Sequence, residues 1–120
     1  MIAVGWLAAD VAPDASPIVE PLALAQGVEP SAEAVARFLQ QAGVDPFPWS
    51  NGPGDRYPPH VHSYTKLLMC ASGSITFLVG DDQAPIALTP GRGFVLPPGT
   101  RHAAVVGPEG CRCVEGHRAS

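Results

Sequence analysis

The chain has 120 residues and a mass of 12.4 kDa, which is the size of one domain. Apolar residues make up 46% and charged residues 15%, so the chain can bury a core and is not expected to be disordered. The net charge is −4 and the basic residues are scattered, whereas nucleic-acid binders usually carry a clustered basic patch. We therefore expect no nucleic-acid partner.

The sequence also argues against a membrane protein and a secreted one. No apolar run approaches the ~20 residues of a membrane-spanning helix, so we expect no membrane partner. The first residues are apolar, but no Lys or Arg precedes them and Asp10 follows at once, so we expect no signal peptide. Three cysteines, an odd number, do not make a disulfide framework. A cytoplasmic location is the resulting prediction.

The N-terminal part, residues 1–46, is predicted to be an extended arm followed by one short helix. Residues 1–30 are rich in proline and have no clear period, which predicts an arm with one edge strand around 18–24. Ser31 can cap a helix whose apolar residues fall on one face, and Gly43 is a natural stop. This part and the remainder of the chain are expected to form a single structural domain.

From Phe47 to the end at residue 120 the pattern changes to short apolar runs bounded by turn residues. The chain contains 13 Gly and 14 Pro, which is typical of many turns between short strands. The predicted strands are 47–50, 59–62, 66–71, 74–79, 86–88, 93–96, 102–106 and 111–115, with Ser72-Gly73 and Gly107-Pro108 among the turns. Strands this short predict an all-β sandwich or barrel.

Three of the four histidines occupy positions that suit a metal site. His60 and His62 are separated by one residue, so on a strand both side chains point to the same face. His102 begins another predicted strand, and inward positions of two strands can face each other in a small barrel. Three imidazoles meeting there would suit Zn, Fe, Ni or Cu. The alternative is that the histidines face solvent, because strand alternation also places polar pairs on the wet face.

Two segments, 54–73 and 91–102, carry Gly, Pro and His residues at set spacings. The residues are Gly54, His60, His62 and Gly73 in the first segment, and Gly91, Pro97, Gly99 and His102 in the second. The two patterns resemble the two motifs of the cupin superfamily, and the resemblance covers about residues 49–116. It implies a small jelly-roll β-barrel, commonly a dimer, with a metal site in the barrel mouth.

The chain departs from the cupin pattern at Lys66, which stands where the family has a glutamate ligand, and at Val106, which stands where it has asparagine. A protonated lysine has no acceptor and cannot replace a carboxylate ligand. What remains is a three-His site on His60, His62 and His102, similar to that of thiol dioxygenases and diketone-cleaving cupins.

Lys66 is the only lysine in the chain, and it is a candidate catalytic or ligand-binding residue. A divalent metal on three neutral imidazoles keeps its charge, and Lys66 would add one more, which favours an anionic ligand. In the alternative, Lys66 points outwards and pairs with Asp55 or Asp82. Complete loss of the metal is also open, because like charge beside a metal weakens its binding.

Tyr64 is the second candidate catalytic residue, because it can donate a hydrogen bond to a bound oxygen or act as an acid. The alternative is that it packs as a rim residue. No acidic residue lies in the motif core, so a general base would have to be Lys66, Tyr64 or a metal-bound hydroxide. Arg56, Tyr57 and Arg101 are expected at the surface or at the entrance of the site. Three cysteines are expected in the core: Cys70, Cys111 and Cys113. His117 is expected to be exposed and to stand alone.

Together these features predict a small cupin barrel that binds a divalent metal through three histidines. It would be a metalloenzyme, of dioxygenase or isomerase type, that acts on a small anionic molecule. The alternative is a non-catalytic barrel that binds a small ligand with or without metal, and the fold does not choose between them. The edge strand of the arm predicts pairing with a neighbour's sheet and therefore a homodimer.

Overall fold

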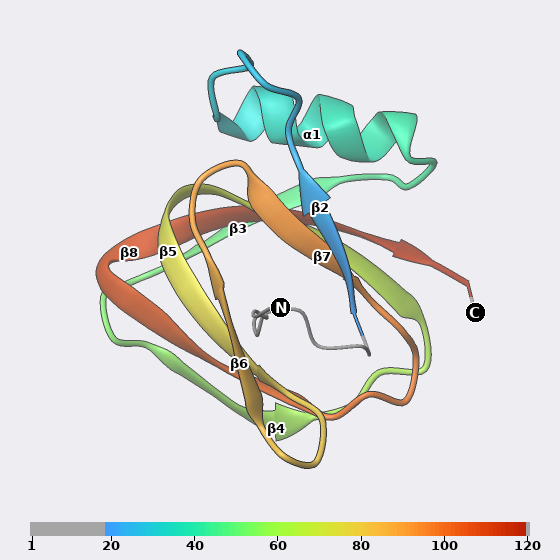
Figure 1. The fold of residues 1–120 in the computed structure, drawn as a ribbon, viewed down its shortest axis with the longest axis vertical. Helices are drawn as coiled ribbons and strands as arrows, with labels where there is room; N and C mark the ends of the chain where they lie inside the picture. Colours follow the sequence, from blue (N-terminus) through green and yellow to red (C-terminus); the bar gives the residue numbers. More distant parts are fainter. Residues whose placement is uncertain (1–18, 120) are drawn as a thin grey trace, which may run out of the picture.

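The structure is a computed structural model, and it describes residues 19–119. Most of the predicted arm and the predicted absence of a signal peptide concern residues 1–18, which lie outside the described residues. In chain order the elements are β2 (Glu20–Ala23), α1 (Ala32–Gln41), β3 (Phe47–Asn51), β4 (Arg56–His60), β5 (Thr65–Val79), β6 (Ala84–Leu88), β7 (Arg92–Leu96) and β8 (His102–Arg118) (Figure 1).

One antiparallel sheet of seven strands curls around the interior, and two long strands, β5 and β8, form its spine (Figure 1). The first half of β5 pairs with β7 and its second half pairs with β6. Likewise the first half of β8 pairs with β4 and its second half with β3. Because β5 and β8 also pair with each other over most of their length, they hold both layers of the barrel together. The all-β prediction is confirmed.

The predicted turns at Ser72-Gly73 and Gly107-Pro108 are wrong. The chain continues as strand through both positions, so strands 66–71 and 74–79 are one element, β5, and strands 102–106 and 111–115 are one element, β8. The pairing of β5 with β8 shifts register on either side of Gly73, whose φ is +72°. A glycine there lets the strand bend sharply as a bulge without reversing its direction.

The helix forms as its sequence predicts and covers one outer face of the sheet. The Ser31 hydroxyl accepts a hydrogen bond from the Ala34 amide at 3.0 Å, and Gly43 follows the helix with a φ of +94°. Val35 and Leu39 are buried in the cluster that the helix makes with the outward side chains of β5. The other face of β5 lines the barrel interior, so Lys66, Leu68 and Cys70 point inwards. Beyond the register shifts around Gly73 the alternation changes phase, and Ile75, Phe77 and Val79 point inwards.

The predicted edge strand is present as β2, which pairs with β7 of the same chain from Glu20 to Ala23. Strand β4 is shorter at its end than predicted: it stops at His60, and His62 lies in the connection to β5. Between residues 19 and 119 there is no helix with the length and apolar character needed to cross a membrane.

Replacing Gly73 with alanine should lower the stability of the barrel severely. A Cβ at Gly73 would lie 2.0 Å from the backbone oxygen of Gly110, and the positive φ adds strain. We expect Gly73→Ala to lower the free energy of unfolding by about 3 kcal/mol or more in a urea titration. Gly27 is the matched control, because its φ is +89° but nothing lies within 4 Å of the position that a Cβ would take there. Gly27→Ala should cost only about 1 kcal/mol, and an equal loss in both variants would contradict the bulge interpretation.

Candidate metal centre and ligand pocket

The structure brings His60, His62 and His102 together at one end of the barrel. His60 is the last residue of β4 and pairs in register with His102, the first residue of β8. His62 is held beside them by the loop before β8, because the Gly99 amide donates a hydrogen bond to the His62 carbonyl at 2.8 Å. One ring nitrogen from each histidine lies within 4.8 Å of those of the other two. Two segments of the chain, around residues 60–62 and at His102, therefore bring three imidazoles together.

Backbone carbonyls orient two of the three rings. The Nδ1–H of His60 donates to the Pro58 carbonyl at 2.8 Å, and the Nδ1–H of His102 donates to the Thr100 carbonyl at 2.9 Å. These bonds leave the Nε2 atoms with free lone pairs, which is the usual arrangement for metal-binding histidines. The buried Nε2 atoms of His62 and His102 have no hydrogen-bond partner. Unpartnered buried nitrogens of this kind fit a divalent metal ion.

The electrostatic surroundings favour the neutral form of His62 and His102. Burial lowers the pKa of His102 to about 4, which outweighs its hydrogen bond to Thr100, so the ring is neutral at pH 7. Burial also lowers the pKa of His62, and the positive charge of Lys66 lowers it further. A neutral imidazole offers the lone pair that a metal requires.

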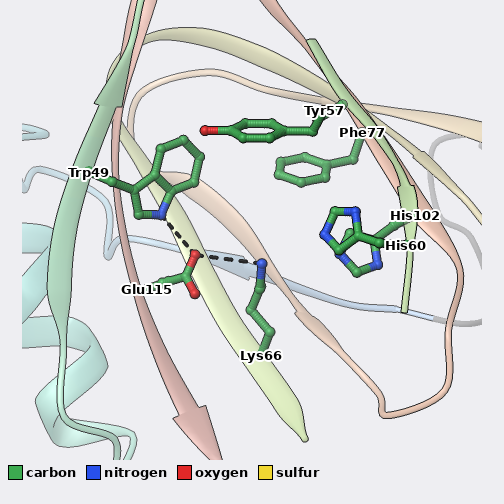
Figure 2. A pocket seen from close by; sticks show the side chains of 8 residues that line it. Trp49, Tyr57, His60, Lys66, Phe77, His102 and Glu115 are labelled. Carbon is green, nitrogen blue, oxygen red and sulfur yellow. Dashed lines mark hydrogen bonds and ion pairs between the residues drawn. The ribbon is translucent and has the colours of Figure 1, made fainter. Parts of the chain in front are cut away.

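A cavity of about 180 Å³ opens beside His60 and His102 (Figure 2). Its wall is aromatic on one side and carries an ion pair on the other. The lining residues are Trp49, Tyr57, His60, Lys66, Phe77, His102, Ala104 and Glu115. Trp49 and Tyr57 meet edge to face, and Tyr57 donates a hydrogen bond to the Asn51 side chain. The cavity can hold a small molecule with a flat apolar body and polar groups.

Lys66 points into this cavity and is only 8% exposed. Of the two orientations that the sequence left open, the structure has the inward one, and neither Asp55 nor Asp82 pairs with it. Its Nζ lies 3.6 Å from Oε1 of Glu115, and Figure 2 shows the ammonium between Glu115 and the histidines. The expected charge of Lys66 is therefore present in the pocket but has a counter-ion.

Glu115 is the residue that the sequence reasoning missed. The sequence reasoning found no acidic residue in the motif core and limited the candidate general bases accordingly, but Glu115, which lies outside that core, is 7% exposed and lines the cavity. Its Oε1 accepts a hydrogen bond from the Trp49 indole at 2.8 Å, and its Oε2 accepts one from His117 Nε2 at 2.6 Å. Strand alternation could have identified Glu115 from the sequence. Cys111 and Cys113 face the core, so Glu115, two residues further along the same strand, faces it too.

Tyr64 contacts the site without lining the cavity. Its ring stacks on His62 with centroids 4.7 Å apart and on His117 with centroids 3.9 Å apart. Burial raises the pKa of Tyr64, so the phenol stays protonated at neutral pH. His117 is exposed as predicted but does not stand alone, because it bonds Glu115 and stacks on Tyr64.

The remaining predicted residues divide between the cavity, the surface and the core. Tyr57 lines the cavity, whereas Arg56 and Arg101 are exposed. The three cysteines are free and buried in the barrel core: Cys70, Cys111 and Cys113.

Comparison with known proteins identifies a family for the chain and solved structures with a similar fold. The model of the family described as the AraC-like ligand-binding domain matches residues 49–114. No curated protein matches the chain in sequence. An RmlC-like cupin from Shewanella frigidimarina NCIMB 400 is similar with a TM-score of 0.56 and 22% identity, over 64% of this chain and 67% of that one.

Two further solved structures share the fold. A Klebsiella pneumoniae protein with a double-stranded β-helix domain has a TM-score of 0.55 and 25% identity, over 62% of this chain and 65% of that one. The ribosomal oxygenase YcfD of Escherichia coli, in complex with cobalt and succinic acid, has a TM-score of 0.60 and 22% identity. That match covers 73% of this chain but only 29% of YcfD.

Breaking the Lys66–Glu115 pair from either side should destabilise the fold unequally. Glu115→Leu leaves the Lys66 ammonium with no counter-ion among the described residues, and we expect a loss of about 3 kcal/mol or more in the free energy of unfolding. Lys66→Met leaves Glu115 with its bonds from Trp49 and His117, so the loss should be about 1–2 kcal/mol. Urea titrations of both variants and of the double variant measure this. A larger loss for Lys66→Met than for Glu115→Leu would contradict it.

Proposed function

The chain belongs to the AraC-like ligand-binding domain family of the cupin superfamily, and we propose that it binds a divalent transition metal and a small anionic molecule. His60, His62 and His102 would hold the metal. The observation that carries the proposal is the convergence of these three rings, two of which, His62 and His102, have buried Nε2 atoms with no hydrogen-bond partner. Three imidazoles accept several first-row ions, so Zn, Fe, Ni and Cu are all candidates.

The remaining cavity residues would bind and orient the ligand beside the metal. The metal, when bound, supplies positive charge and open coordination positions for an anionic group. Lys66 donates hydrogen bonds to a ligand oxygen from within the cavity. Trp49, Tyr57 and Phe77 cover the apolar part of the ligand and exclude water from it. The small volume of the cavity restricts the ligand to a small molecule.

A metalloenzyme is the second candidate function, and one observation favours it. The site offers three protein ligands where a structural metal site usually has four, so a bound metal would keep a position for a ligand, and two of the histidines line the cavity. In that case Lys66 would donate a proton within the cavity, and Tyr64 would hold His62 in place through its stacked ring. The reaction would be of dioxygenase or isomerase type. The match to a ligand-binding family favours binding without catalysis.

A homodimer in the cytoplasm is part of the proposal. Strand β2 pairs with β7 on one edge, and no other described strand pairs with it, so a second copy could add to that edge. All three cysteines are free, which suits a reducing compartment. Light scattering at micromolar protein should give twice the mass of the chain, and a monomer mass would contradict the dimer.

Metal content is the direct test of the proposed site. Elemental analysis of untagged protein purified without chelator should find about one metal per chain. The double variant His60→Ala, His102→Ala should lose it, because two of three ligands are gone. Val61→Ala is the matched control, since Val61 lies between two of the histidines but its side chain is 55% exposed, and it should keep the metal. A metal-free native protein that stays empty after reconstitution with Fe, Ni, Zn and Cu would contradict the proposal.

Oxygen consumption by the metal-loaded protein distinguishes the two candidate functions. Small thiols, diketones and hydroxy acids are the substrates to screen for oxygen use, and product analysis would detect isomerisation. Turnover that disappears in the double-histidine variant would establish the metalloenzyme. Tight binding of a small anion without turnover would establish the binding function.

A further inference from the structure

The buried carboxylate of Glu115 accepts a hydrogen bond at each of its two oxygens. Trp49 donates to one oxygen at 2.8 Å and His117 donates to the other at 2.6 Å. Trp49 lies on β3 and is partly buried, whereas His117 is exposed but stacks on Tyr64 and meets Phe47 edge to face. Both carboxylate oxygens of Glu115 therefore have a hydrogen-bond partner that does not belong to the ligand.

The ammonium of Lys66, in contrast, has no hydrogen-bond partner among the described residues. Its Nζ lies 3.6 Å from Glu115, close enough for an ion pair but too far for a hydrogen bond, and no other described residue pairs with it. A nine-tenths buried ammonium with three donors needs acceptors that the described residues do not provide. Its charge is balanced, but its hydrogen-bonding capacity is free and faces the cavity.

We propose that Glu115 is a specificity-determining residue: it cancels the charge of Lys66, so that the ammonium acts in the ligand site as a hydrogen-bond donor rather than as an attractor of anions. The inference rests on the ligand site of the proposed function but not on the metal. Lys66 and Glu115 are the only side chains of Lys, Arg, Asp or Glu that line the cavity among the described residues. Without metal, the site therefore selects ligands by an acceptor oxygen and an apolar body, and negative charge on the ligand adds little.

The consequence for the loaded site is that any preference for anions comes from the metal alone. A carboxylate would be attracted by the metal and would receive hydrogen bonds from Lys66, whose own charge Glu115 has already balanced. Removing Glu115's charge should thus create an anion site that needs no metal. Removing the charge of Lys66 should leave Glu115 to repel anions.

Benzoate and benzamide are the matched probes, because they share a flat ring and an acceptor oxygen but differ in charge. Both are titrated by calorimetry into chelator-treated, metal-free protein at about pH 8, where free histidines are neutral. The quantity measured is the ratio of the benzoate affinity to the benzamide affinity. For the native protein we expect a ratio within about threefold of one, because the cavity has no net charge.

The variants shift this ratio in opposite directions. Glu115→Gln keeps an oxygen for the Trp49 indole and an amide for His117, and it should raise the ratio about tenfold or more. Lys66→Gln should lower the ratio by about tenfold or more. The double variant Lys66→Gln, Glu115→Gln should return it to about the native value, because the cavity is again uncharged.

Three results would overturn the inference. They are a native ratio of about ten or more in favour of benzoate, a ratio that Glu115→Gln does not change, and failure of the native protein to bind either probe at millimolar concentration. If Glu115→Gln does not fold, the native ratio and the Lys66→Gln ratio still decide it. Because these titrations exclude metal, a protein that never binds metal can still give the expected ratios. A protein that binds metal can equally fail them.

Discussion

The pairing of β5 with β8 is the constraint on which both the barrel and the site depend. The two strands run antiparallel from Thr65 opposite Arg118 to Val79 opposite His102. Because both bend at the same corner, near Gly73, one end of the ladder belongs to each layer of the barrel. The same ladder places Lys66 on one strand and Glu115 on the other, both facing the interior. A register slip of one residue in either strand would turn its charged residue towards the helix-covered face and away from its partner.

The buried charges are arranged so that neither is isolated. An unpaired charge in a small hydrophobic barrel would be strongly destabilising, and the lysine that stands in place of a cupin glutamate creates that problem. Glu115 on the neighbouring strand is the counter-ion of Lys66, and its two oxygens accept hydrogen bonds from Trp49 and His117. The result is a cavity in which the metal-binding histidines, a balanced ion pair and an aromatic wall occupy separate sides. The sides are nevertheless coupled, because the Trp49 indole of the aromatic wall donates to Glu115 and the charge of Lys66 lowers the pKa of His62.

Local patterns predicted the elements and the histidine cluster well, because their causes are local. The capping Ser31, the stop at Gly43 and the spacing of the two motifs are readable in short windows of sequence. The sequence did not reveal that Gly73 marks a bend rather than a turn, because that depends on a partner strand nearly forty residues away. Glu115 was missed for a related reason, because its role depends on its contacts with other residues. Lys66 and Trp49 lie on other strands, and His117 follows Glu115 on β8.

Lys66 and His62 belong to parts of the fold that differ in their resistance to local unfolding. Lys66 lies on β5, which has a hydrogen-bonded strand on each side and, from Lys66 to Ala71, buried side chains on both faces. His62 lies in a connection outside any strand, and its carbonyl is held by a single amide, that of Gly99. Amide hydrogen exchange should accordingly be slowest along β5 and much faster around His62. Brief local opening of that connection would displace His62 while Lys66 and Glu115 stay in place.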